Sequence, residues 1–183
     1  MQPESIEQHL TKKYGPGIAR SLRDPNSSLN RMGRENGIHW NHDRNVYPTQ
    51  KAHALMEFVQ QRKSKEEANQ LMEIMYKAYF EDGADIADVN VLKGFAKPLL
   101  ADSSSSSSSS QDTEIDAAIE SALSVENQDK VTAKVNALRT KYRVSGVPHF
   151  IIESNTKGRP PATFSGAYPV DVLAEQLEEA AGI

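Results

Sequence analysis

The sequence predicts an α/β protein that is mostly helical, with a long run of helices followed by one strand–strand–helix unit. Three observations lead to this fold class. Apolar residues recur at helical spacing through the first 143 residues. Two short runs rich in β-branched and aromatic residues follow at 147–152 and 162–165. An amphipathic segment over 172–180 then predicts a last helix.

Turn and capping residues mark the expected ends of the first helices. One helix has Pro3 in its opening turn and stops at the sequence Gly15-Pro16-Gly17. The next is interrupted near Pro25 and ends at Asn36-Gly37, a pair typical of a left-handed C-cap. Residues 37–49 are predicted to form a loop that leads into a helix opened by Pro48-Thr49.

Three further boundaries are expected before residue 100. Ser64 and Glu67 have the spacing of a capping box, which predicts the start of a helix at this point. Asp85 is the expected N-cap of a shorter helix, and Pro98 is expected to close it. Two more helical faces follow near the middle of the chain, one formed by Ile115, Ile119 and Leu123 and the other by Val131, Val135 and Leu138.

An unbroken run of eight serines, Ser103 to Ser110, lies between the helix that Pro98 is expected to close and the helix that carries Ile115. Serine side chains bury little apolar surface, so the entropy lost on ordering them is not compensated. We therefore expect a disordered, serine-rich surface loop over residues 101–112.

Composition excludes several classes of function. The chain of 183 residues has a net charge of −4, which gives it no broad attraction to nucleic acid or to anionic lipid. It contains no cysteine, which excludes a disulfide, a thiol nucleophile and a Cys-X-X-Cys redox pair within this sequence. Neither a signal peptide nor a transmembrane segment is visible, so a soluble cytoplasmic location is the expectation.

The predicted β-hairpin raises a physical problem. A two-stranded hairpin packed on one helix is marginally stable by itself. The apolar strand Phe150-Ile151-Ile152 has the composition of a central strand rather than an edge strand. We therefore expect it to require neighbouring strands that this sequence does not supply.

The C-terminal motifs resemble those of a known family. The segment Ser145-Gly146-Val147-Pro148-His149-Phe150-Ile151-Ile152, a hairpin, and then Phe164-Ser165-Gly166-Ala167 resemble the second half of DsbA-like thioredoxin folds. The closest resemblance is to the FrnE-type branch, whose helical insert is matched in order by Glu35-Asn36-Gly37-Ile38, Ala52-His53-Ala54-Leu55, Lys77-Ala78-Tyr79-Phe80, Asp85-Ile86-Ala87-Asp88 and Val91-Leu92. The resemblance implies an incomplete thioredoxin-like fold, with a helical insert subdomain at 1–143 and the C-terminal half of a thioredoxin-like domain at 144–183.

Members of this family begin with a strand, a helix that carries Cys-X-X-Cys, and a second strand. The resemblance therefore implies that this unit is missing here, which would leave the hairpin without its expected parallel partner. Three explanations stay open: a truncated chain, a degenerate paralogue that binds without catalysis, and a separate polypeptide that supplies the missing strands.

The resemblance also points to candidate site residues. It implies a cis peptide bond between Val147 and Pro148, which would leave the backbone of Val147 free to pair with an extended peptide or with glutathione. From the residues alone, Pro148 merely beginning a strand is an equal alternative. His149 is expected to be exposed or at an interface, and Arg44 and Asn45 could line the groove by family analogy. No catalytic residue and no metal site are predicted, and the spacing of His39, His42 and Asp43 is weak evidence for a metal.

Three functions are compatible with these residues. The first is an incomplete or inactive copy of a thiol-disulfide oxidoreductase, with a peptide or thiol as the substrate. The second is a glutathione-binding relative of the kappa-like transferases and isomerases, in which glutathione would be the ligand. The third is a non-catalytic binding module that requires a partner strand or forms an oligomer. No cofactor other than glutathione, no nucleic acid and no membrane is expected as a partner.

Overall fold

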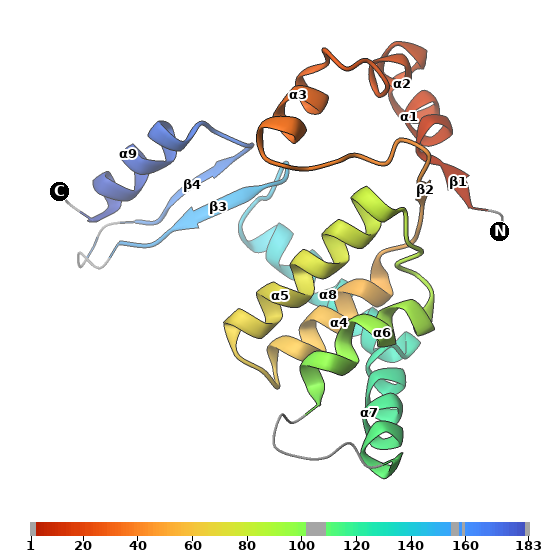
Figure 1. Ribbon diagram of the computed structural model, residues 1–183. Helices are drawn as coiled ribbons and strands as arrows, with labels where there is room; N and C mark the ends of the chain where they lie inside the picture. The colour runs from red at the N-terminus through yellow and green to blue at the C-terminus, as the bar shows by residue number, and fades with distance from the viewer. Residues whose placement is uncertain (1–2, 102–108, 155–157, 159, 182–183) are drawn as a thin grey trace. The chain divides into compact units, whose positions relative to one another are not determined.

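The computed structural model describes residues 3–101, 109–154, 158 and 160–181. Helices dominate, and the strands form two small sheets, which confirms the predicted fold class (Figure 1). The chain forms two compact units, Met1–Thr132 (unit 1) and Ala133–Ile183 (unit 2). The division falls within helix α8, Val125–Lys141, whereas the predicted subdomain boundary follows that helix.

The N-terminal part of unit 1 consists of short helices and a small sheet of two strands, each two residues long. Its elements are β1 (Glu4–Ser5), α1 (Ile6–Tyr14), α2 (Pro16–Ser21), α3 (Ser28–Glu35) and β2 (Asn45–Val46). Strands β1 and β2 pair antiparallel, so the segment predicted to be a loop over 37–49 contains a strand. A strand of two residues is too short to show the alternation that predicts a strand from sequence.

The first helix begins later than expected, after Ser5 rather than around Pro3. The Ser5 side chain accepts a hydrogen bond from the Gln8 backbone, and the Gln8 side chain accepts one from the Ser5 backbone. This reciprocal pair is a capping box, which satisfies two backbone donors at the helix start. Helix α1 ends at Tyr14, next to Gly15, in agreement with the end predicted from the sequence.

The core of unit 1 is a helical bundle, visible as the α4–α7 group in Figure 1. Its elements are α4 (Gln50–Gln60), α5 (Lys65–Lys77), the π-helical turn η1 (Ala78–Asp82), α6 (Val89–Leu100) and α7 (Ser109–Ala122). The apolar faces of these helices meet in one cluster, which includes Leu55, Val59, Leu71, Leu92 and Ile119. Burial of these side chains supplies most of the hydrophobic stabilisation in this unit.

Three predicted boundaries in the bundle were wrong. Helix α6 continues through Pro98 to Leu100, because Ala96 and Leu99 are buried in the core and hold the last turn in place. Its N-cap is Asp88, not Asp85, and the Asp88 carboxylate accepts from two backbone N–H groups. Helix α7 begins at Ser109, inside the loop predicted for 101–112; residues 102–108 of that loop lie outside the described part of the chain.

Unit 2 contains the end of α8 and a hairpin with one helix, as the sequence predicted. Strand β3 (His149–Ile152) pairs antiparallel with β4 (Ala162–Ser165), and Phe150 lies opposite Phe164. Helix α9 (Val170–Ala181) packs against β3. Among the described residues of this unit, Ala180 alone is buried, so the hairpin and its helix enclose very little core.

A helix needs about 20 mostly apolar residues to cross a bilayer. Over the described residues, no helix combines enough length with enough apolar character to cross a membrane.

Candidate functional site

The turn that leads into β3 exposes Val147 and Pro148. The peptide bond between them is cis, which is the geometry that the family resemblance implies. The Val147 side chain is 85% exposed, an unusual position for a β-branched residue next to an apolar strand. The Pro148 carbonyl accepts a hydrogen bond of 2.8 Å from the Gly166 backbone N–H, which anchors the turn to the end of β4.

That hydrogen bond fixes which backbone groups face outward along both strands. In an antiparallel pair, hydrogen-bonded and non-hydrogen-bonded residue pairs alternate. Since Pro148 and Gly166 form a hydrogen-bonded pair, His149 and Ser165 form the next, non-hydrogen-bonded pair. The backbone N–H and C=O groups of His149 and Ile151 therefore point away from β4, toward the outer edge of β3. The backbone N–H and C=O groups of Thr163 and Ser165 likewise point away from β3, toward the outer edge of β4.

His149 and Ser165 are joined by their side chains as well as by register. The His149 Nδ1 atom lies 2.7 Å from the Ser165 Oγ atom. Side chains approach most closely at non-hydrogen-bonded pairs, which explains the short distance. His149 Nε2 is buried without a hydrogen-bond partner among the described residues. This contact joins β3 to β4 at the first residue pair of the hairpin, next to the Val147–Pro148 turn.

Arg44 and Asn45, the predicted groove residues of unit 1, have local partners. The Arg44 side chain is only 8% exposed, donates to the Asn41 carbonyl over 2.7 Å, and lies over the rings of Tyr79 and Phe80. Its backbone carbonyl accepts from the Ile6 N–H. Asn45 belongs to β2 and donates to the Tyr47 hydroxyl. In unit 1, Arg44 therefore contributes to packing, and a ligand-binding role for either residue stays a prediction.

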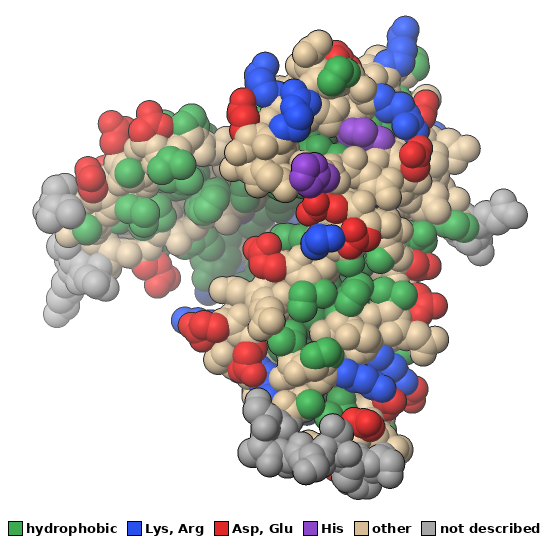
Figure 2. Space-filling view, in the orientation of Figure 1, with side chains coloured by type: hydrophobic (Ala, Val, Ile, Leu, Met, Phe, Trp, Pro, Cys, Tyr) green, Lys and Arg blue, Asp and Glu red, His purple; other side chains and the backbone are tan. Residues whose placement is uncertain are grey.

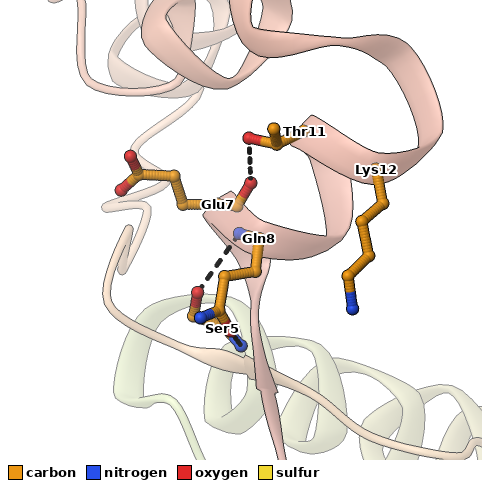
Figure 3. Close-up of a pocket in the computed structure, with 5 residues that line it drawn as sticks. All are labelled: Ser5, Glu7, Gln8, Thr11 and Lys12. Carbon is orange, nitrogen blue, oxygen red and sulfur yellow. Dashed lines mark hydrogen bonds between the residues drawn. The ribbon is translucent and has the colours of Figure 1, made fainter.

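A shallow pocket of about 460 Å³ lies along α1 and is lined by Ser5, Glu7, Gln8, Thr11 and Lys12 (Figure 3). The polar groups on this wall are already engaged in capping and helix hydrogen bonds. Next to it, Lys12 and His9 both contact the Glu4 carboxylate, and these partners lower the pKa of Glu4. The arrangement stabilises the start of α1.

Comparison with known proteins identifies the family to which the chain belongs. The family model of the DSBA-like thioredoxin domain matches residues 11–178. The chain belongs to this family. Among solved structures, the chain is similar to one described as a probable DsbA oxidoreductase from Streptomyces coelicolor, with a TM-score of 0.71 and 22% identity, over 99% of this chain and 68% of that one. The comparison with curated proteins gave no significant match.

For this DSBA-like domain, the similarity to a solved structure supports the fold. The candidate site is inferred from the positions and contacts of the residues of this chain. The structure brings Val147, Pro148 and His149 together with Ser165, a residue that the sequence analysis did not select. The signal for Ser165 was available in principle, because a hairpin with a known register pairs it with His149. Without the register, a serine at a strand end carries no distinguishing feature.

The loop between α3 and β2 holds the histidine with the clearest electrostatic perturbation. Burial lowers the pKa of His42, and the positive charges of Arg44 and Arg23 lower it further. The neighbouring Asp43 carboxylate forms a 2.5 Å ion pair with Arg23. Within the described residues, no group of three His, Cys, Asp or Glu side chains is placed to hold a metal ion.

The DSBA-like domain is expected to lose stability on mild acidification because of His42. In the unfolded chain this imidazole takes up a proton near its ordinary pKa of about 6.5, whereas in the folded chain it stays neutral to lower pH. The free energy of unfolding therefore falls as the pH decreases from 7 through about 6.5 and below. Urea unfolding of the protein and of His42→Gln across this range measures the effect.

The variant should show a smaller change in stability between neutral pH and about pH 5 than the unsubstituted protein. His39→Gln is the matched control, because it removes an exposed imidazole from the same loop. Identical pH profiles for the unsubstituted protein and His42→Gln would contradict the assignment.

Proposed function

We propose that this chain supplies the substrate-binding side of a FrnE-like thiol-disulfide oxidoreductase, and that it binds an extended peptide or thiol substrate at the Val147–Pro148 turn and the outer edge of β3. The observation that carries the proposal is the exposed turn, which lies at the start of a strand whose outer backbone groups have no partner strand among the described residues.

The edge of β3 is suited to adding one more strand. The backbone groups of His149 and Ile151 point outward, so they can form antiparallel or parallel hydrogen bonds with an extended chain. Exposed edges are usually protected from such pairing by lysine or other charged residues. The β3 sequence, His149–Ile152, contains no lysine, arginine, aspartate or glutamate. Main-chain pairing gives affinity for any extended peptide, and Val147 adds an apolar contact at one end.

Redox turnover needs groups that this sequence does not contain. Disulfide exchange proceeds by attack of a thiolate on a disulfide sulfur, and the chain has no cysteine. We therefore propose that the thiolates come from another polypeptide segment. Oxidised glutathione is the small ligand proposed for the same turn, because it combines an extended backbone with a disulfide.

A charge at the turn should weaken binding without affecting the fold. Val147→Asp places a carboxylate on a side chain that is 85% exposed, so the stability should change by no more than about 0.5 kcal/mol. The probe is a fluorescein-labelled neutral peptide, Ser-Val-Ala-Val-Ser, titrated with the protein and followed by anisotropy. The substitution is expected to raise its Kd about tenfold, because binding would bury an unpaired charge.

The control is Val170→Asp, at an equally exposed valine (83%) in the same unit. It should leave the Kd of the probe unchanged, and oxidised glutathione should displace the probe from the unsubstituted protein. Equal Kd values for the unsubstituted protein and Val147→Asp would refute the assigned surface. Measurable reduction of insulin by this chain would refute the requirement for external thiolates.

A further inference from the structure

Unit 2 contains a second surface, separate from the Val147–Pro148 turn. Helix α9 packs against β3, and the space that remains between α9 and β4 is a groove of about 260 Å³. Its lining consists of Ala162, Thr163, Phe164, Tyr168, Val172 and Gln176. Three of these residues are consecutive in β4, and the other three are spaced by four along the segment that leads into and through α9.

The groove runs along β4 and is lined by three consecutive residues of that strand. Side chains alternate between the two faces of a strand, so Ala162 and Phe164 share one face and Thr163 points to the other. The groove therefore lies over the face that carries Ala162 and Phe164, and since β4 has no described strand on its other side, its outer edge borders the groove. The alternation derived above directs the backbone N–H and C=O of Thr163 toward that edge, where no described strand accepts them.

The floor of the groove is aromatic. The Phe164 and Tyr168 rings meet edge to face, with centroids 5.4 Å apart, and the Phe150 ring stacks on Phe164 from β3 at 5.0 Å. Val172 continues this apolar wall along α9, and the Gln176 amide lies at its end. A groove of this volume and lining suits one apolar or aromatic side chain, with a polar group beside it.

The charged side chains of α9 all have the same sign. Helix α9 carries four acidic residues, Asp171, Glu175, Glu178 and Glu179, and neither lysine nor arginine. Figure 2 shows apolar side chains gathered over the hairpin and α9, with acidic side chains along the helix. A peptide in the groove would lie next to these carboxylates, so basic flanking residues would be attracted and acidic ones repelled.

We propose that the groove between β4 and α9 binds an extended peptide that has an aromatic residue flanked by lysine or arginine. The peptide adds a strand to β4 through the backbone of Thr163, places its aromatic side chain against Phe164, Tyr168 and Val172, and sets its basic residues beside the α9 carboxylates. This mode is strand addition in a groove between a strand edge and a helix, with main-chain hydrogen bonds for affinity and the pocket for selectivity.

The test uses the full chain and three labelled peptides followed by anisotropy. Lys-Val-Phe-Val-Lys is the expected ligand, Lys-Val-Ala-Val-Lys lacks the aromatic side chain, and Glu-Val-Phe-Val-Glu reverses the flanking charge. The first should bind about tenfold or more tightly than either of the others, and its affinity should fall as salt is added. Equal affinity for the lysine-flanked and glutamate-flanked peptides would overturn the proposal.

A pair of variants at Thr163 tests the strand addition. Thr163→Pro removes an outward N–H that the β3–β4 ladder does not use, and proline is tolerated at strand edges. It should raise the Kd of Lys-Val-Phe-Val-Lys about tenfold or more, whereas Thr163→Val, which keeps the N–H, should leave it unchanged. Equal Kd values for the two variants would overturn the backbone contact.

A second variant keeps the test decisive if the proline weakens the hairpin. Glu175→Lys, on the exposed surface of α9, should raise the Kd for the lysine-flanked peptide and lower it for the glutamate-flanked one. Absence of this reversal would overturn the charge assignment. Thr163→Pro should leave binding of the Ser-Val-Ala-Val-Ser probe at the turn before β3 unchanged, so failure of this groove and failure of that turn are distinguishable.

Discussion

Gly33→Ala is expected to destabilise the N-terminal part of the protein by about 2–4 kcal/mol, since it combines overpacking with loss of a hydrogen bond. A Cβ atom added at Gly33 would overlap Nε1 of Trp40, which two such atoms cannot tolerate. The indole would have to move. That movement would break its donated hydrogen bond to the Leu29 carbonyl and its edge-to-face contact with Phe80.

The effect can be followed directly, because Trp40 is the only tryptophan in the sequence. Denaturant unfolding followed by indole fluorescence should show a lower midpoint for Gly33→Ala and an altered emission maximum before unfolding begins. The matched control is Gly94→Ala in α6, where an added Cβ meets nothing within 4 Å. That substitution should stabilise the protein by about 0.5–1 kcal/mol through helix propensity. A midpoint for Gly33→Ala equal to or above that of the unsubstituted protein would contradict the packing described.

The contact between Gly33 and Trp40 also illustrates what the sequence could not predict. Periodicity identified the helix that contains Gly33 and the C-cap at Asn36-Gly37, because both signals are local. The approach of an indole to a helical glycine depends on how the following loop folds back, which no local pattern records. The same reason explains the missed pairing of β1 with β2, whose partners are far apart in the sequence.

The hairpin site was predictable to a different degree. The two strands and the final helix follow from β-branched runs and helical spacing, and the structure confirms each of them. Most of the turn predicted between the strands lies outside the described residues. The pairing of His149 with Ser165 and the outward direction of Thr163 depend on register, which one hydrogen bond from Gly166 to Pro148 determines. A shift of one residue in the register moves every side chain of a strand to the opposite face. The strands and the helix could therefore be predicted from the sequence, whereas the arrangement of the site could not.

Leu71→Ala is expected to have an effect as large as that of Gly33→Ala, for the opposite physical reason. Leu71 in α5 is 0% exposed and lies in the cluster formed by α4, α5, α6 and α7. Truncation removes buried methyl groups and leaves a cavity that the surrounding helices fill only in part, which costs about 2–5 kcal/mol. Urea unfolding followed by far-ultraviolet circular dichroism should show a lower midpoint, because the helices of this bundle provide much of the signal.

The same truncation at an exposed leucine isolates the contribution of burial. Leu29→Ala in α3 removes the same atoms from a side chain that is 47% exposed, and it leaves the backbone carbonyl that accepts from Trp40 in place. Its effect should stay within about 0.5 kcal/mol. Because the two substitutions are chemically identical, the difference between their effects measures how much the protein depends on the helical bundle. Equal losses for both would show that Leu71 is not in a packed core, and that the bundle of unit 1 is assembled differently.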